Sequence, residues 1–233
     1  MSEMKNALAV GLTELGLTVD DATQDRLCAF GEAVVRQNEV MNLTAITEPA
    51  QVARLHLLDS ISLLKVMDLT DKRLIDVGCG AGFPGVPLKI ACPALKLTLL
   101  DSLGKRMTWL STVLPTLGVE ANTVTARAEE YVTGCREQYD VATSRAVARL
   151  PILLELTAPY VKKGGYVLAM KGAAAAEELA ESKHAIRKLG LTLEKVVEFP
   201  MEDTCHNVLV FRKTTPTPPQ YPRRYAKIKQ APL

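Results

Sequence analysis

The stretch DVGCGAGFPGVPLKI, residues 76–90, decides the fold. A short apolar run, RLIDVG (73–78), leads into it, and VPLKIACP (86–93) follows as a predicted helix. Alternating glycines separate the two, at Gly78, Gly80 and Gly82. Because glycine has no side chain, a ligand can approach the backbone of such a turn closely. The pattern therefore predicts a strand, a ligand-binding turn and a helix in that order.

Two cofactor classes fit a glycine-rich turn at this place. GAGFPG (80–85) matches the G-x-G-x-x-G pattern of dinucleotide-binding proteins, whose pyrophosphate binds at a helix N-terminus. S-adenosylmethionine has no phosphate and would lie on the bare backbone, with Asp76 placed to help hold its ammonium group. A tight structural turn without a ligand is a third interpretation. The turn alone therefore does not separate a methyltransferase from an oxidoreductase.

Residues after the next two predicted strands extend the cofactor site. LLDS (99–102) ends in a strand-closing acid, Asp101, which is placed to bind the ribose hydroxyls of either cofactor. Ala128 and Glu129 follow the third strand and can lie beside an adenine. KKGGYVLAMKG (162–172) resembles the Gly-Gly turn before the fifth strand of many methyltransferases. Because no histidine is placed for a hydride-transfer pocket, these features favour S-adenosylmethionine.

The rest of the chain predicts an α/β fold. Strands alternate with helices from residue 73 to a helix at 173–190, which predicts a parallel sheet covered on both faces. The last two strands, at 191–200 and 205–213, have no helix between them and are expected to form an antiparallel hairpin at one end of the sheet. Before residue 70, apolar residues recur at helical spacing, with an interruption before Pro49, which suits a first helical turn.

Composition excludes several classes of protein. The chain has 233 residues, 48% of them apolar, which is enough for a sizeable core. Five irregularly spaced cysteines and three histidines predict neither a disulfide framework nor a metal site. No apolar run approaches the roughly 18 residues that span a membrane, and the start lacks the pattern of a signal peptide. A cytoplasmic protein without a membrane partner is expected.

Charge is distributed unevenly. The formal net charge is +2, but residues 211–233 hold six basic groups and no acid. The other 210 residues hold 22 basic and 26 acidic groups, a net charge of −4. A basic end on an acidic body suggests a polyanionic partner. A solvated terminus that aids solubility is the alternative interpretation.

The motifs together resemble those of one family. The segments that carry the resemblance are MNLTAI (41–46), HLLDSI (56–61), LIDVGCGAGFPGVPL (74–88), LLDSLGKR (99–106), ARAEE (126–130), SRAVA (144–148), MKG (170–172) and YPRR (221–224). They cover nearly the whole chain, and the chain is similar to the RsmG family, also called GidB. These are methyltransferases that act on guanine N7 in 16S ribosomal RNA, at position 527 in the 530 loop.

The resemblance implies a Rossmann-like class I S-adenosylmethionine-dependent fold with a mostly parallel seven-stranded sheet. It divides the chain into an N-terminal helical extension (1–70), a methyltransferase domain (71–213) and a basic, Pro-containing C-terminal tail (214–233). The resemblance implies 16S ribosomal RNA or the small ribosomal subunit as the partner, and a monomer is expected because an RNA-reading monomer needs no further subunit. The family's cofactor contacts carry over onto Gly78, Phe83, Ala128, Glu129 and Arg145. The glycine and ribose arguments add Gly80, Gly82 and Asp101.

The chemistry of guanine N7 requires few groups. N7 has an in-plane lone pair and attacks a methyl group without first losing a proton, so placement and desolvation can supply the rate. The DPPY-like motif of amino-group methyltransferases is absent, and no Pro-Cys pair follows the fourth strand. Arg145 and Lys171, at the ends of the fourth and fifth strands, are the candidate catalytic residues, because ligands bind at the carboxyl ends of such sheets.

Basic and aromatic residues are candidates for RNA contact. The predicted RNA-binding residues are Lys105, Arg106, Lys171, Arg223 and Arg224. Candidate surfaces for base stacking are Phe83, Tyr221 and Tyr225, and Asn42, Arg54 and His56 are expected at the mouth of the site. Two alternatives remain from the residues alone, an NAD(P)-dependent oxidoreductase that uses GAGFPG and a non-catalytic RNA-binding module.

Overall fold

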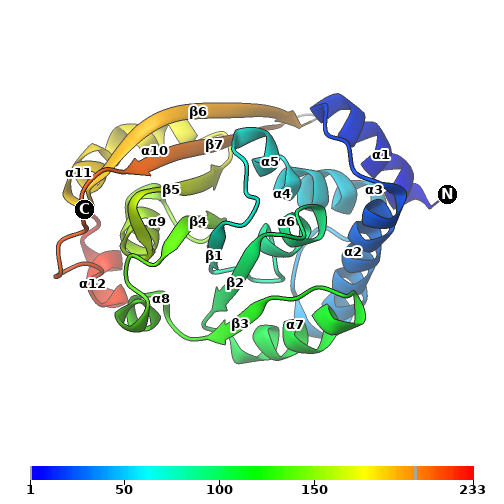
Figure 1. Cartoon of the computed structure of the whole chain (residues 1–233), viewed down its shortest axis with the longest axis horizontal. Helices are drawn as coiled ribbons and strands as arrows, with labels where there is room; N and C mark the ends of the chain where they lie inside the picture. The colour runs from blue at the N-terminus through cyan, green and yellow to red at the C-terminus, as the bar shows by residue number, and fades with distance from the viewer. Residues whose placement is uncertain (1, 202–203) are drawn as a thin grey trace.

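One seven-stranded sheet organises the chain, for which the computed structural model describes residues 2–201 and 204–233 (Figure 1). Its strands in chain order are β1 (Arg73–Val77), β2 (Lys96–Asp101), β3 (Asn122–Thr125), β4 (Tyr139–Arg145), β5 (Val161–Lys171), β6 (Leu191–Met201) and β7 (Thr204–Lys213). Their spatial order is β3-β2-β1-β4-β5-β7-β6. Strands β1 to β5 are parallel, and β7 is antiparallel to both β5 and β6. The predicted α/β sheet and its terminal hairpin are confirmed.

Helices cover both faces of this sheet, because successive side chains of a strand point to opposite faces. Leu74 of β1 packs into one hydrophobic core and Ile75 into the other. The covering helices are α6 (Gly85–Ala91), α7 (Gly104–Thr116), α8 (Ala128–Tyr131), α9 (Leu150–Thr157), α10 (Ala175–Glu181) and α11 (Lys183–Lys188). Helices α6 and α7 belong to the first core, and α8 to α11 belong to the second.

The helix predicted over residues 173–190 is wrong in one respect, because the chain forms two helices there. Helix α10 ends at Glu181 and α11 begins at Lys183. Between them, the fully buried Ser182 hydroxyl donates to the Glu178 carbonyl at 2.7 Å. A serine that bonds to the carbonyl four residues back competes with the helical ladder and bends the helix.

The N-terminal extension is helical, as predicted. Its elements are α1 (Glu3–Leu15), α2 (Asp21–Met41), α3 (Pro49–Val52), the π-helix η1 (Ala53–Leu58), α4 (Asp59–Ile61) and α5 (Leu63–Val66). Pro49 occupies the first turn of α3, and Glu48 caps that helix through its carboxylate. Buried side chains of the extension share the first core with the sheet. No helix in the described part of the chain is long and apolar enough to cross a membrane.

The C-terminal segment, residues 214–233, folds back on the domain through a buried lysine. Lys213 ends β7 and is fully buried. Its ammonium donates to the Ala158 carbonyl at 2.7 Å and to the Thr217 hydroxyl at 2.5 Å, with Glu137 at 3.2 Å. Burial lowers the pKa of Lys213 to about 8. The contacts of the buried Lys213 ammonium therefore fix the chain where it leaves the sheet.

Two arginines and one short helix hold the rest of this segment. Arg136 donates to three backbone carbonyls at 2.7 to 3.0 Å, those of Thr217, Pro218 and Tyr221. Arg223 donates to the fully buried Glu155 of α9 through Nε at 2.9 Å and Nη2 at 2.6 Å. Helix α12 (Tyr225–Gln230) follows and buries Ile228. Helix α12 packs against α9, and Figure 1 shows it at the end of the molecule that carries the C-terminus.

Replacing Arg223 by Ala should destabilise the fold, because it removes the charged partner of a buried carboxylate. The expected loss in the free energy of unfolding is about 3 kcal/mol, the lower end of the range for breaking a buried ion pair. Arg224→Ala is the matched control, since it removes the same charge from the exposed neighbouring residue and should cost no more than about 0.5 kcal/mol. Urea unfolding compares the two. Equal losses would contradict a structural role for the Arg223–Glu155 pair.

Candidate active site

A cavity of about 590 Å³ opens at the carboxyl ends of β1 to β4. The strand order reverses between β1 and β4, and ligands of open α/β sheets bind at such a switch point. The sequence-predicted residues that line it are Gly78, Gly80, Phe83, Asp101, Arg106, Ala128, Glu129 and Arg145. Residues far apart in sequence therefore meet at one cavity.

The glycines of the opening turn have three different tasks. Gly78, with a φ of +72°, lies under Val147, whose methyl carbon would be 2.5 Å from an added Cβ. Gly82, with a φ of +96°, packs against Val86 and does not line the cavity. Gly80 has a φ of +57°, and a Cβ there would meet only the Arg106 guanidinium, at 3.9 Å. The missing side chain at Gly80 therefore keeps the cavity floor open.

Hydrogen bonds within the turn decide which ligand it fits. The Gly85 amide, which begins α6, donates to the Asp76 carboxylate Oδ2 at 2.8 Å. The Gly82 and Phe83 amides both donate to the Cys79 carbonyl, at 2.8 and 3.1 Å. A dinucleotide pyrophosphate needs free amides at this helix start. Because these amides are bonded inside the protein, the turn disfavours a dinucleotide and fits a ligand without phosphate.

Asp76 itself lies outside the cavity, although the sequence placed it near a cofactor's ammonium group. The side chain is fully buried, and Oδ1 has no partner among the described residues. Burial raises the pKa of Asp76 to about 8, despite the bond from Gly85. Asp76 therefore stabilises the turn from the protein interior by accepting the Gly85 amide.

Asp101 presents a carboxylate to the cavity from the end of β2. Its Oδ2 accepts from the Gly80 amide at 3.0 Å, and its Oδ1 accepts from the Leu103 amide at 2.8 Å. A carboxylate has about four lone-pair sites, so each oxygen keeps one for another donor. Two adjacent hydroxyl groups, such as those of a ribose, match this arrangement.

Ala128 and Glu129 begin α8 and line the same cavity. The Ala128 carbonyl accepts from the Tyr160 hydroxyl at 2.5 Å, so Tyr160 fixes this turn from the core. The Glu129 carboxylate is largely buried and lies 4.0 Å from Arg127. Because the Ala128 carbonyl is already bonded, the Glu129 carboxylate is the main acceptor that the start of α8 offers to a ligand.

Arg145 joins the sheet to the N-terminal extension. Its Nη1 donates to the Leu55 carbonyl at 3.0 Å and to the Asp59 carboxylate at 2.9 Å. Its Nη2 lies 3.2 Å from Nδ1 of His56, and its Cζ lies 5.0 Å from the centre of the Phe83 ring. Together these contacts fix the guanidinium on the cavity wall.

The π-helix η1 brings His56 into the site. The ring stacks on Phe83 with centroids 4.7 Å apart, and its Nε2 lies 2.8 Å from the Thr44 hydroxyl. Its Nδ1 lies 3.1 Å from the Leu55 carbonyl and 3.2 Å from Nη2 of Arg145. Burial, together with the charge of Arg145, lowers the pKa of His56 to about 4. His56 is therefore a neutral packing partner near pH 7, at one of the π-turns that often occur at functional sites.

A second cavity of about 590 Å³ adjoins the first at the ends of β4, β5 and β7. The two share His56 and the turn Arg145–Val147. In that turn, Ala146 has a φ of +57°, a left-handed conformation that is uncommon for a residue other than glycine. His206 lines the second cavity, and its Nδ1 lies 2.7 Å from Asp59.

Asp59 thus has two basic partners, Arg145 and His206. Burial alone would raise the pKa of Asp59, but the bonds from His206 and Arg145 lower it overall. The same bond raises the pKa of His206. Asp59 therefore fixes one basic side chain in the wall of each cavity. No cluster of potential metal ligands occurs among the residues that the structure describes.

Lys171 lies in the second cavity with its charge already paired. Its ammonium lies 2.7 Å from the Glu178 carboxylate and donates to the Ala148 carbonyl at 2.5 Å. The pair ties α10 to the turn after β4. The catalytic and RNA-binding roles of Lys171 stay predictions.

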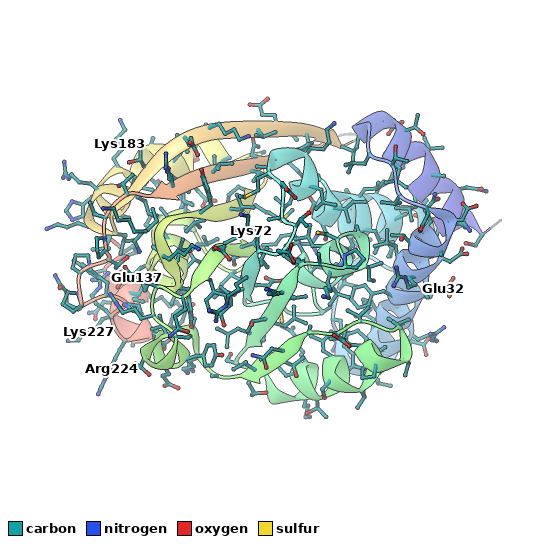
Figure 2. The ribbon with its side chains drawn as sticks, viewed as in Figure 1. Glu32, Lys72, Glu137, Lys183, Arg224 and Lys227 are labelled. Carbon is teal, nitrogen blue, oxygen red and sulfur yellow. The ribbon has the colours of Figure 1, made fainter. Side chains whose placement is uncertain are left out.

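The other predicted RNA-binding residues form two adjacent pairs, one at the start of α7 and one directly before α12. Lys105 is exposed at the start of α7, and Arg106 lies 4.0 Å from Asp101. Arg223 is paired with Glu155, whereas Arg224 is exposed. Figure 2 shows Arg224 at the outer edge of the molecule. Lys105 and Arg224 are therefore the members of this set whose charges are the most available to RNA.

Sequence reasoning missed Asp59 and His206, and it expected Tyr225 at an RNA base and not at the first cavity. Asp59 is buried on a short helix of the extension, and a buried acid signals a buried basic partner. His206 and Tyr225 reach the cavities from the far end of the chain, and no local pattern marks either as part of a cofactor site.

Two kinds of comparison with known proteins agree with this geometry. The family model described as rRNA small subunit methyltransferase G matches residues 23–207. The ribosomal RNA small subunit methyltransferase G of Alkaliphilus metalliredigens (strain QYMF) is 44% identical over 237 residues. This match covers 99% of each chain, so the similarity spans both the extension and the sheet.

Solved structures support the fold. A methyltransferase from Pyrococcus furiosus has a TM-score of 0.57 at 16% identity, covering 82% of this chain and 98% of that one. TYW2 of M. jannaschii, crystallised with AdoMet, has a TM-score of 0.54 at 14% identity, covering 66% and 76%. The predicted class I methyltransferase fold is confirmed.

Asp76→Asn should change how stability depends on pH. The pKa of Asp76 is raised from 3.8 to about 8 in the folded protein, so the folded chain holds a proton here that the unfolded chain releases. Between about pH 4 and pH 8, the wild type therefore loses stability as the pH rises, by up to about 1.4 kcal/mol per unit. The amide of the variant does not titrate, so the variant gains relative to the wild type over this window. Urea unfolding at pH 5.5, 7 and 8.5 measures the difference, and a constant difference would contradict the raised pKa.

Proposed function

The chain belongs to the rRNA small subunit methyltransferase G family, and from that membership we propose that it methylates N7 of a guanine in 16S ribosomal RNA. S-adenosylmethionine is the methyl donor, and the small ribosomal subunit or its RNA is the substrate. Within the proposal, the guanine is the one at position 527 in the 530 loop. The family match confirms the resemblance seen in the sequence motifs, and the acceptor atom and position rest on that resemblance.

The first cavity fits S-adenosylmethionine by the chemistry of its walls. Asp101 keeps one lone-pair site on each oxygen for the two ribose hydroxyls. Gly80 leaves the floor open, and Glu129 can accept from the adenine amino group. When bound, S-adenosylmethionine supplies a methyl group made electrophilic by its sulfonium. Bonded amides at the start of α6 argue against a phosphate-bearing cofactor in the same place.

The single observation that carries the proposal is the pair of adjoining cavities. They share the turn Arg145–Val147, with the glycine turn on one side and the ends of β5 and β7 on the other. A transferase must hold its donor and its acceptor against each other while it excludes water. We assign the donor to the first cavity and the guanine to the second.

Arg145 is the residue best placed to position the guanine. Its Nη1 donors are used by Leu55 and Asp59, and one Nη2 donor by His56. A guanidinium has five N–H donors. Among the contacts of the described residues, the Nε proton and one Nη2 proton have no partner, so they remain available to a ligand. These can bond to guanine O6 or to a phosphate while N7 keeps its lone pair for the reaction.

The reaction needs no general base. A bond forms from guanine N7 to the methyl carbon, the bond from that carbon to sulfur breaks, and its electron pair stays on sulfur. No proton leaves N7, which agrees with the low pKa of His56, a poor proton acceptor near pH 7. The protein therefore contributes orientation and desolvation, with Arg145 held rigidly by its three partners on the extension.

The decisive experiment is methylation of RNA in vitro. Purified protein is incubated with radiolabelled S-adenosylmethionine and either 16S ribosomal RNA or assembled small subunits from a strain that lacks the gene. We expect the label in 7-methylguanosine at one position, identified by mass spectrometry of nucleosides and by primer extension after cleavage at the modified base. RNA with adenosine in place of that guanine is the control and should remain unlabelled.

Other outcomes would each overturn the proposal in a recognisable way. Label on another base or atom would refute the assignment of N7. RNA binding without methyl transfer would identify a non-catalytic RNA-binding module. Tight binding of NAD and not of S-adenosylmethionine would favour the oxidoreductase alternative.

Gly80→Ala should weaken cofactor binding, because the new methyl group would project from the open floor of the cavity. We expect the Kd for S-adenosylmethionine in titration calorimetry to rise about tenfold or more, the cost of overfilling a packed site. Gly118→Ala is the matched control. Gly118 has a similar φ of +63° and nothing within 4 Å of an added Cβ. The Gly118→Ala variant should be less stable than the wild type but should bind S-adenosylmethionine with the same affinity. Equal affinities of the Gly80→Ala and Gly118→Ala variants would place the cofactor elsewhere.

A further inference from the structure

The end of the first cavity nearest β3 has walls of small or exposed apolar residues. Ala126 and Ala128 line it with methyl groups only, and Leu103, which also lines the cavity, is 51% exposed. A flat apolar ligand group would cover this surface and remove it from water. If S-adenosylmethionine is the cofactor, its adenine is the group of that shape, since Asp101 fixes the ribose beside it.

One aromatic residue from the C-terminal segment lines the same cavity. Tyr225 begins α12 and is partly buried there. The other rings of the cavity, His56 and Phe83, stack on each other at the opposite end, beside Arg145. Among the described residues, the Tyr225 ring contacts no other ring or cation, and its hydroxyl makes no hydrogen bond. The side chain is therefore not committed to another aromatic or polar partner while it lines the cavity.

The protein body fixes the position of Tyr225 from both sides along the chain. Two residues before it, Arg223 is bonded to the buried Glu155 of α9. Three residues after it, Ile228 is fully buried. Further back, Arg136 donates to the Tyr221 carbonyl at 2.7 Å. Because these contacts already hold the segment in place without a ligand, cofactor binding loses little further conformational entropy in this segment.

We propose that Tyr225 forms a wall of the adenine-binding end of the cofactor site, so that the C-terminal segment is part of the S-adenosylmethionine site. This inference rests on the proposed function, because it needs an adenine in the first cavity. The contact is made by the aromatic ring, which offers a polarizable face to a purine. It replaces the expectation from sequence that Tyr225 stacks on an RNA base, because Tyr225 lines the donor cavity and not the acceptor cavity.

Three variants of the full-length chain test the proposal by titration calorimetry with S-adenosylmethionine and with S-adenosylhomocysteine. Tyr225→Ala should raise the Kd for both about tenfold, the effect of removing one stacking partner of a base. Tyr225→Phe, which retains the ring, should retain most of the affinity. Lys227→Ala is the matched control, because it changes an exposed residue of the same helix (Figure 2) and should bind both compounds as the wild type does.

Limited proteolysis of each variant shows whether the C-terminal segment is still docked, so that a loss of affinity is not mistaken for local unfolding. Unchanged affinity of Tyr225→Ala would overturn the inference, and so would an equal loss in Tyr225→Phe. Reduced methylation of RNA by Tyr225→Ala with unchanged affinity for S-adenosylmethionine would return Tyr225 to an RNA-binding role. Failure of the wild type to bind S-adenosylmethionine would instead refute the proposed function itself.

Discussion

A hydrogen bond from the Gly85 amide to the Asp76 carboxylate joins the first strand of the sheet to the helix after it. This bond lies beneath the glycine turn, where a dinucleotide-binding protein would bind pyrophosphate with the same amide. Other amides of the turn are bonded to Cys79 and Leu100. The turn therefore offers a ligand its bare surface and not its hydrogen-bond donors. An adenosine joined to its second half through a sulfonium, with no phosphate, suits that surface better than a pyrophosphate does.

The buried Asp59 has a similar organising role between the two cavities. It comes from the N-terminal extension, and it bonds to Arg145 of β4 and to His206 of β7. A buried carboxylate is stable only when its charge is matched, so its pairing fixes both basic side chains in the cavity walls. The extension is thus more than an added lobe, because Asp59 and the neighbouring π-helix form part of the wall of the second cavity.

The sequence predicted those parts of the fold and of the site that a motif of a few consecutive residues specifies. Alternating glycines, the acid that closes β2 and the strand–helix alternation all belong to this kind. Contacts between distant segments could not be found in the same way. His206 and Asp59 are 147 residues apart in sequence, and Arg223 and Glu155 are 68 apart. A single sequence shows which residues are charged, but it does not show which charges neutralise one another after folding, as Lys171 and Glu178 do.

The C-terminal segment illustrates this difference between formal charge and available charge. Its sequence suggested a uniformly basic arm, but Lys213 and Arg223 face Glu137 and Glu155 inside the protein. These buried pairs anchor the segment and leave Arg224 exposed directly beside Tyr225. The turn that brings an aromatic ring to the first cavity therefore also presents a cation next to it. Under the proposed function, attraction for RNA phosphate and closure of the cofactor site would come from adjacent residues of one anchored segment, and removing the segment would affect both together.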